Sequence, residues 1–345
     1  MSRFATGTAP TFTAVSLGLA LAATGFVVAP AWADDTQAQA DRAATTIAAA
    51  AAGTIVNLAP AGDASTATAN STQVTLPTTS DGAVTMVTTD QSIKPLVTPV
   101  SISLPRETGG KHAKQAKNGT MVYPRGSGNS ADAAVQVLAD GSVRLSTVLA
   151  SKNSPTRFTY TIAGATPELQ ADGSVNLVQT TDTGGALIQA TVGTIAPAWA
   201  KDANGRPVAT HYEVKGNGQL VQVVTPDKNT TYPVVADPDV GFCWSGGLCL
   251  NLVGMRALQL LSLPVSVLYG SSVVLGYYVP WLGAVLAVAS IVGLIPSLVD
   301  AMSLVLRASG IHPYHCYQAN LIMNRGKPAK RVAASNCYGE GYPVY

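Results

Sequence analysis

The stretch AVQVLADGSVRLSTV, residues 134–148, decides the fold class of this chain. Two short runs of alternating apolar and polar residues flank the turn Ala-Asp-Gly-Ser, and Asp-Gly favours the tight turns that close β-hairpins. The stretch therefore predicts two antiparallel strands. The residues expected to fill one buried face are Val135, Leu138, Val143 and Leu145.

Similar signals continue from residue 72 to residue 238, where short runs rich in Val, Thr, Leu and Gln are separated by turn dipeptides. Each dipeptide carries residues that tolerate positive φ, as the two-residue turns of hairpins require. The dipeptides are Asp81-Gly82, Asp140-Gly141, Asp172-Gly173, Asn204-Gly205 and Asn217-Gly218. Several strands at this spacing predict a mainly β domain over residues 72–238, built as an antiparallel sandwich or an open barrel.

An export signal stands at the start of the chain. Arg3 supplies a positive charge, residues 14–28 are apolar, and Ala31-Trp32-Ala33 places small residues at the positions that a signal peptidase inspects. We therefore expect residues 1–33 to be a signal peptide that is cleaved before Asp34. An uncleaved N-terminal membrane anchor is the alternative.

The segment between the export signal and the β-rich domain, residues 34–71, is rich in Ala and Thr. No apolar periodicity connects this segment to a core, so the sequence predicts a flexible linker. Within it, residues 42–52 could form a short helix, because Ala is the best helix former.

The charge of the chain is low. Charged residues make up 12% of the 345 residues and the net charge is +2. Nucleic-acid binding requires a concentration of Lys and Arg, so this balance gives no reason to expect a nucleic acid as partner. Low charge with abundant Ala, Thr, Val and Gly is typical of an exported β-rich protein.

Two stretches resemble segments of secreted actinobacterial proteins of unknown function. They are PAWAKDANGRPVATHYEV, residues 197–214, and the Tyr-Pro-Val-Val-Ala-Asp-Pro motif of residues 232–238. Together they resemble the end of a β-rich module that precedes divergent C-terminal regions, some of them in surface and toxin-like proteins. The resemblance covers about residues 131–238 and implies no activity and no catalytic residue. Proline cannot donate to a strand ladder, so Pro238 also predicts the end of the last strand.

Residues 257–299 carry no charge over forty-three consecutive positions. Each half of this run has the length that a bilayer requires of a helix, and Tyr277, Tyr278 and Trp281 between the halves are interfacial residue types. We therefore expect residues 239–345 to be an apolar α-helical region, with a two-helix membrane hairpin over 257–299 and both flanks outside. The alternatives are a single span with the tail inside, or soluble helices packed on the β-domain.

Four cysteines, two on each side of the apolar run, are an even number in a chain that carries an export signal. This arrangement predicts two disulfides with three possible connectivities, and a hairpin would favour bonds that join one flank to the other. The cysteines are Cys243, Cys249, Cys316 and Cys337. A metal site at His312, His315 and Cys316 is the alternative, but a zinc site usually needs four well-spaced ligands. We expect no metal site.

Catalytic motifs are missing from the sequence, which lacks a nucleophile elbow, a His-Glu-x-x-His motif and a phosphate-binding loop. His211 lies in a predicted strand and is expected at the surface. A Cys316–His312 nucleophile would need a free thiol, which export disfavours. Asp202-x-Asn204-Gly205 predicts a turn rather than a calcium loop. The Lys- and Arg-containing residues 106–130 predict a solvated loop rather than an anion site, so we expect no catalytic, cofactor-binding or metal-binding residues.

Taken together, the sequence predicts a secreted or extracytoplasmic, membrane-associated cell-envelope protein. A non-catalytic β-module would be anchored by the C-terminal apolar hairpin, in a structural or interactive role. The expected partners are a lipid membrane and an unidentified protein or cell-wall component, without nucleic acid. The alternative function is a secreted effector whose C-terminal apolar region inserts into target membranes.

Overall fold

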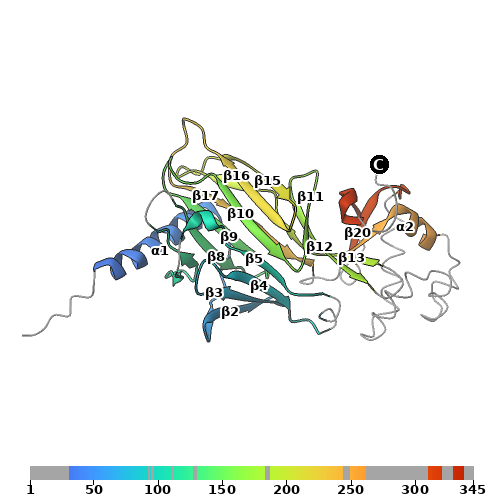
Figure 1. Cartoon of the computed structure of the whole chain (residues 1–345), viewed down its shortest axis with the longest axis horizontal. Coiled ribbons are helices and arrows are strands. Elements are labelled where there is room, and N and C mark those ends of the chain that lie inside the picture. The colour runs from blue at the N-terminus through green and yellow to red at the C-terminus, as the bar shows by residue number, and fades with distance from the viewer. Residues whose placement is uncertain are drawn as a thin grey trace, which may run out of the picture.

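The computed structural model describes residues 31–337 except 92–93, 95–96, 110–111, 127–129, 183–186, 244–248, 262–309 and 321–328. Its strands form two sheets in which every pair is antiparallel (Figure 1). The mainly β class predicted from the sequence is confirmed. Helix α1 lies at one end of the long axis, and the C-terminal elements lie at the other.

The smaller sheet has eight strands. In spatial order these are β1 (Ala59–Ala61), β2 (Ala64–Ala69), β3 (Thr72–Pro77), β4 (Ala83–Thr88), β5 (Val100–Ser103), β10 (Arg157–Ala163), β16 (Gln219–Thr225) and β15 (Ala209–Lys215). Neighbours are mostly joined by tight hairpins, such as the β15–β16 turn, where Asn217 and Gly218 adopt φ of 62° and 70°. The Asn217-Gly218 turn signal is therefore confirmed.

The larger sheet has thirteen strands. Its main path is β21 (Lys330–Val332), β20 (Cys316–Asn320), β19 (Cys249–Val253), β13 (Leu187–Ile195), β18 (Asp239–Phe242), β9 (Val143–Leu149), β8 (Asp132–Val137), β7 (Met121–Tyr123) and β6 (Lys114–Gln115). Off this path, β11 (Thr166–Leu169) and β12 (Val175–Asp182) join through β13, and β14 (Trp199–Lys201) and β17 (Val234–Asp237) join through β9.

The stretch 134–148 forms the predicted hairpin. Strands β8 and β9 pair with Val135 opposite Leu145 and Val137 opposite Val143, and Gly141 takes a φ of 84° in the turn. Every residue of both strands is buried, because one face meets the core and the other is covered. Leu138, expected on the buried face, lies beyond the end of β8 and outside the main core cluster, although it is also buried.

One apolar core lies between the two sheets. It joins Phe158 and Tyr160 of the smaller sheet to Leu145, Leu177 and Ile195 of the larger sheet, all of them with less than 2% of their surface exposed. Burial of such side chains is the main favourable term in folding. Two sheets that share a core in this way form a β-sandwich, one of the two architectures that the sequence left open.

The linker prediction for residues 34–71 is wrong, because helix α1 (Ala31–Ala50) and strands β1 and β2 lie there. Ala40, Ala44 and Ile47 of α1 pack on Val122 and Ala134 on the outer face of the larger sheet. Alanines recur at helical spacing along this face, and their small size lets the helix approach the sheet closely. The expected signal peptide, residues 1–33, lies outside the described residues except for its last three positions.

Two cations hold the C-terminal end of α1. Lys201 Nζ donates to the Ala50 carbonyl at 2.8 Å, and Arg144 Nη2 donates to the Ala52 carbonyl at 3.2 Å. The last carbonyls of a helix have no intrahelical partner and carry partial negative charge, so cations stabilise them. The helix is therefore fixed to the sandwich by packing and by its end.

The β-structure continues beyond Pro238. Strand β17 ends at Asp237 as expected, but Pro238 only separates it from β18, and β19 to β21 extend the same sheet. The described helices of the region 239–345 are α2 (Gly254–Leu261) and the 3₁₀ turn η3 (Ala334–Cys337), while η1 (Arg106–Thr108) lies earlier in the chain. The predicted hairpin of residues 257–299 lies outside the described residues beyond Leu261. Within the described residues, no helix combines the length and the apolarity needed to cross a membrane.

The predicted two disulfides are confirmed, but each joins cysteines on one flank, Cys243 to Cys249 and Cys316 to Cys337. Cross-flank bonds, which the hairpin favoured, are wrong for a geometric reason. Strands β19 and β20 pair with Cys249 and Cys316 at opposite ends of the ladder, four residues apart. This separation is about 13 Å along a strand, well beyond the Cα–Cα distance that a disulfide spans.

Candidate functional site

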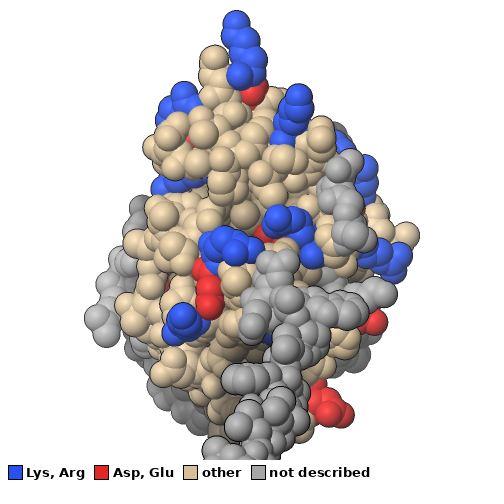
Figure 2. Space-filling model, turned by 90° about the vertical axis from the view of Figure 1, so that its left-hand side faces the viewer, with Lys and Arg blue, Asp and Glu red and all other residues tan. Residues whose placement is uncertain are grey.

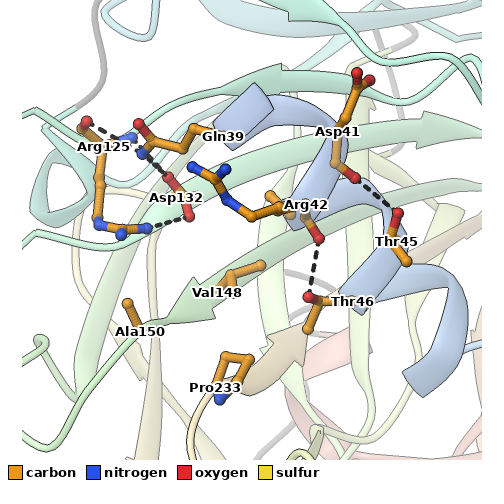
Figure 3. A pocket seen from close by; sticks show the side chains of 11 residues that line it. Gln39, Asp41, Arg42, Thr45, Thr46, Arg125, Asp132, Val148, Ala150 and Pro233 are labelled. Carbon is orange, nitrogen blue, oxygen red and sulfur yellow. Dashed lines mark hydrogen bonds and ion pairs between the residues drawn. The ribbon is translucent and has the colours of Figure 1, made fainter. Parts of the chain in front are cut away.

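A groove of about 560 Å³ lies between α1 and the outer face of the larger sheet (Figure 3). Helix α1 supplies one wall, and β8, β9 and the segment after β7 supply the other. Two carboxylates and two guanidinium groups line it, so the groove favours neither anions nor cations by net charge. These residues are Asp41, Arg42, Arg125 and Asp132.

The polar groups of the groove are largely bonded to one another. Asp132, with 3% of its side chain exposed, accepts from Arg125 Nη1 at 2.7 Å, from the Arg125 backbone N–H at 2.7 Å and from Gln39 Nε2 at 2.7 Å. The hydroxyls of Thr45 and Thr46 donate to carbonyls of their own helix. A carboxylate held in this way is a structural anchor for α1 rather than a general base.

The surface at this end of the molecule carries mixed charge. Figure 2 shows Lys and Arg side chains dispersed among uncharged residues, with Asp and Glu side chains between them. A dispersed pattern gives no continuous field for an anionic polymer. The polar contacts of the groove explain how α1 is held against the sheet.

The Asp202 turn is a second polar cluster. Its buried carboxylate accepts backbone N–H bonds from Asn204, Arg206 and Thr231, and the Arg206 guanidinium donates at 2.6 Å. Burial raises the pKa of Asp202, but the Arg206 hydrogen bond and the backbone donors outweigh it and lower the pKa to about 2. Both carboxylate oxygens face donors, so the turn predicted here is confirmed.

The histidines do not converge on one site. His112 forms a β-bridge with Thr79, and His211 lies on β15 with 60% of its side chain exposed, as expected for a surface strand residue. The rings of His312 and His315 stack at 4.3 Å beside Cys316, whose sulfur is bonded to Cys337. This disulfide removes the thiol that the Cys316 nucleophile or a Cys316 metal ligand would need. Among the described residues, no three His, Cys, Asp or Glu side chains cluster to hold a metal ion.

A second region of interest is the place where the chain enters and leaves the apolar run. Strands β19 and β20 pair with Val253 opposite Cys316, and the Gly254 and Met255 backbone N–H groups donate to the His315 and Pro313 carbonyls at 2.8 Å and 2.9 Å. A Cβ on Gly254 would lie 1.9 Å from the His312 carbonyl oxygen, so this close approach requires glycine. We call α2 together with residues 310–316 the stem.

The stem exposes large apolar side chains. Among the described residues, four such side chains are exposed, and three of them belong to the stem: Met255 (42%), Leu258 (37%) and Tyr314 (53%). The fourth, Leu169 (41%), lies on β11. Met255 and Leu258 are three residues apart and share one helix face, while Ala257 on α2 is fully buried. Grouped exposed apolar residues mark a contact surface.

A buried polar ladder supports the stem from the sheet. Gln189, Asn251 and Gln318 are successive register partners on β13, β19 and β20, and each has at most 6% of its surface exposed. The Thr191 hydroxyl lies 2.9 Å and 3.1 Å from the two amide atoms of Asn251, and Gln318 Nε2 lies 3.5 Å from Asn251 Oδ1. The bonds that Asn251 makes with Thr191 and Gln318 favour this register of β13, β19 and β20.

The sequence predicted the importance of residues 257–299 but not the stem. A signal for the stem is present in the sequence: the short alternation of Cys249-Leu-Asn-Leu-Val253, close before the run, predicts a strand when it is considered alone. The chain matches no protein-family model, no curated protein and no solved structure in these comparisons.

Proposed function

We propose that this chain is an exported cell-envelope protein whose β-sandwich is displayed outside the cell and held at a lipid membrane by the apolar run of residues 257–299. The role of the sandwich is structural or interactive rather than catalytic. The observation that carries the proposal is the continuity between the uncharged run and α2, where Met255 and Leu258 are already exposed.

Three further features support export. Two disulfides persist only in an oxidising compartment, and the export signal at residues 1–33 would deliver the chain there. Residues 131–238 resemble a module of secreted proteins, which agrees with export. This resemblance stays a prediction. In the groove beside α1, Asp132 is paired with Arg125 and accepts from Gln39, which favours a structural role for this carboxylate.

The test is fractionation of cells that produce the chain. The mature protein is expected with the membranes and is expected to be released by detergent. A variant with Leu282→Lys and Leu286→Lys places two charges in the run, and each charge costs about 3 kcal/mol at the centre of a membrane helix, so this variant should become soluble. The matched control carries Thr45→Lys and Ala49→Lys on exposed positions of α1 with the same spacing, and it should stay with the membranes.

Recovery of the unmodified mature protein wholly in the culture medium would contradict membrane anchoring. If that medium also released dye from lipid vesicles, the second candidate function, a secreted effector that inserts into target membranes, would replace the first. The exposed apolar face of the stem is compatible with that candidate, because insertion from outside begins with contact at the membrane surface.

A further inference from the structure

The stem holds the start of α2 against residues 313–315. Five register pairs join β19 to β20, and the backbone of α2 bonds directly to residues 313 and 315. The described structure therefore stops at Leu261, the last residue of α2, and resumes at Gly310, three residues before Pro313, whose carbonyl accepts from the start of α2. Any path that enters a bilayer from this point must come back to the same side.

One disulfide lies directly beside the stem, and the other lies at the far end of β19. Cys249 stands at the start of β19 and is bonded to Cys243, and Cys316 stands at the start of β20 and is bonded to Cys337. Cys249, Cys316 and Cys337 each have at most 5% of their surface exposed. The Cys243–Cys249 bond therefore ties the start of β19 to the residue that follows β18, and the Cys316–Cys337 bond ties β20 to η3.

The exposed side chains of the stem are of the kinds found at a membrane surface. Tyr314 places an aromatic ring with a hydroxyl at the return point, and tyrosine prefers the boundary between hydrocarbon and water. Met255 and Leu258 are apolar and lie on the helix that continues into the uncharged run. Exposed apolar side chains at the N-terminal end of a run long enough to span a bilayer are more stable in contact with lipid than with water.

From these observations we infer that the stem is a lipid-contacting collar. Met255, Leu258 and Tyr314 lie in the interfacial layer of the bilayer, and the sandwich stands directly above them. This inference rests on the proposed function, because it presumes that residues 257–299 engage lipid. It adds which side chains contact the lipid and how deep in the bilayer they lie. A second copy of the chain is the competing occupant of the same apolar face.

The test uses a single added thiol. All four cysteines of the chain are in disulfides, so Leu258→Cys in the mature chain can be labelled alone with an environment-sensitive nitrobenzoxadiazole dye. The matched control is Leu169→Cys, which replaces the same residue type at a similar exposed fraction on β11. Both labelled proteins are mixed with vesicles of equal parts phosphatidylcholine and phosphatidylglycerol, and flotation measures how much protein is bound.

For protein that floats with the vesicles, the dye at position 258 should gain several-fold emission, and nitroxide lipids labelled near the headgroup should quench it. The dye at position 169 should change little. Equal responses at both positions, or no response at 258 in floating protein, would overturn the collar. Failure of both proteins to float would instead overturn the proposed function. If the 258 response rose with protein concentration in the absence of lipid, the face would be a contact between copies and the collar would be wrong.

Discussion

The sandwich body and the C-terminal extension, which comprises β19, α2, β20, β21 and η3, are stabilised in different ways. The body has a large apolar core to which both sheets contribute, and no disulfide lies within it. In the described part of the extension, one buried apolar cluster consists of Val253, Cys316 and Cys337, with Val332 packed against it, and the extension also carries both disulfides. Covalent cross-links therefore add to apolar burial in the extension, whereas the body relies on its core and on hydrogen bonds.

The largest expected effect concerns the body. Phe158→Ala removes a fully buried ring from the shared core and should lower the free energy of unfolding by about 3–5 kcal/mol. Urea denaturation followed by tryptophan fluorescence measures this change. Leu169→Ala, at an exposed position, is the matched control and should change the free energy by less than about 0.5 kcal/mol. A Phe158→Ala cost close to that of the control would contradict the role assigned to the core.

The second effect concerns the extension. Replacing Cys316 and Cys337 by Ser opens a loop with a sequence separation of 21 residues, and loop-closure entropy makes this cross-link worth about 3 kcal/mol. Hydrogen exchange should show faster exchange in β19, β20 and β21, while β8 and β9 keep their protection. A loss of protection spread evenly over both regions would mean that body and extension unfold as one unit, and the comparison above would be wrong.

A third effect tests whether α1 belongs to the body. Ile47 is fully buried against the outer face of the larger sheet, so Ile47→Ala should cost about 2 kcal/mol and should free the helix first. Limited proteolysis should then cut within residues 34–52 sooner than in the wild type. Thr45→Ala on the exposed side of the same helix is the control. Unchanged proteolysis of the Ile47→Ala variant would show that α1 is held by its polar contacts alone.

The smallest effect distinguishes the two regions by pH. Burial, with the charges of Arg331 and His312, lowers the pKa of His315 in the stem below its ordinary value of about 6.5. The unfolded chain then binds more protons than the folded chain just below pH 6.5, so acidification through this range should weaken the extension. In the body, the pKa of Asp202 is lowered to about 2. Its contribution to the free energy of unfolding is therefore fully present above the ordinary carboxyl pKa, and it is lost only as the pH falls toward 2.

Hydrogen exchange at pH 7.5 and pH 5.5, corrected for the intrinsic rates, measures this difference. We expect β20 to lose protection at the lower pH while β15 and β16 keep theirs. The variant His315→Gln should abolish the pH dependence of β20. Persistence of that dependence in the variant would assign it to another group.

The parts of the fold that local sequence determines were predicted well. The hairpin at residues 134–148 and the turn at Asn217-Gly218 follow from dipeptides that accept positive φ, and the period of two along a strand decides which side chains face the core between the sheets. A short helix was expected over residues 42–52, but the full length of α1 and its packing on the sheet were missed, because its buried face consists largely of alanine, which gives a weak apolar signal. Pairings such as β13 with β19 join residues about sixty positions apart, and no local pattern encodes them.

The candidate site was predicted only in part. The cysteine count predicted two disulfides, which the structure contains, and the lipid partner inferred from the uncharged run stays a prediction. The partners of Cys249 and Cys316 could not be predicted, because they depend on the β19–β20 register. The exposure of Met255 and Leu258 likewise depends on how α2 packs against the end of the sheet.

The central claim is that the stem returns the chain to the side of the membrane that carries the sandwich. Cells producing the variant Tyr345→Cys can be treated, while intact, with a membrane-impermeant maleimide, and Leu169→Cys serves as the marker for the sandwich side. Our account predicts that both thiols are labelled without permeabilising the cells. Labelling of position 169 but not of position 345 until the membrane is opened would place the tail on the other side and contradict the account.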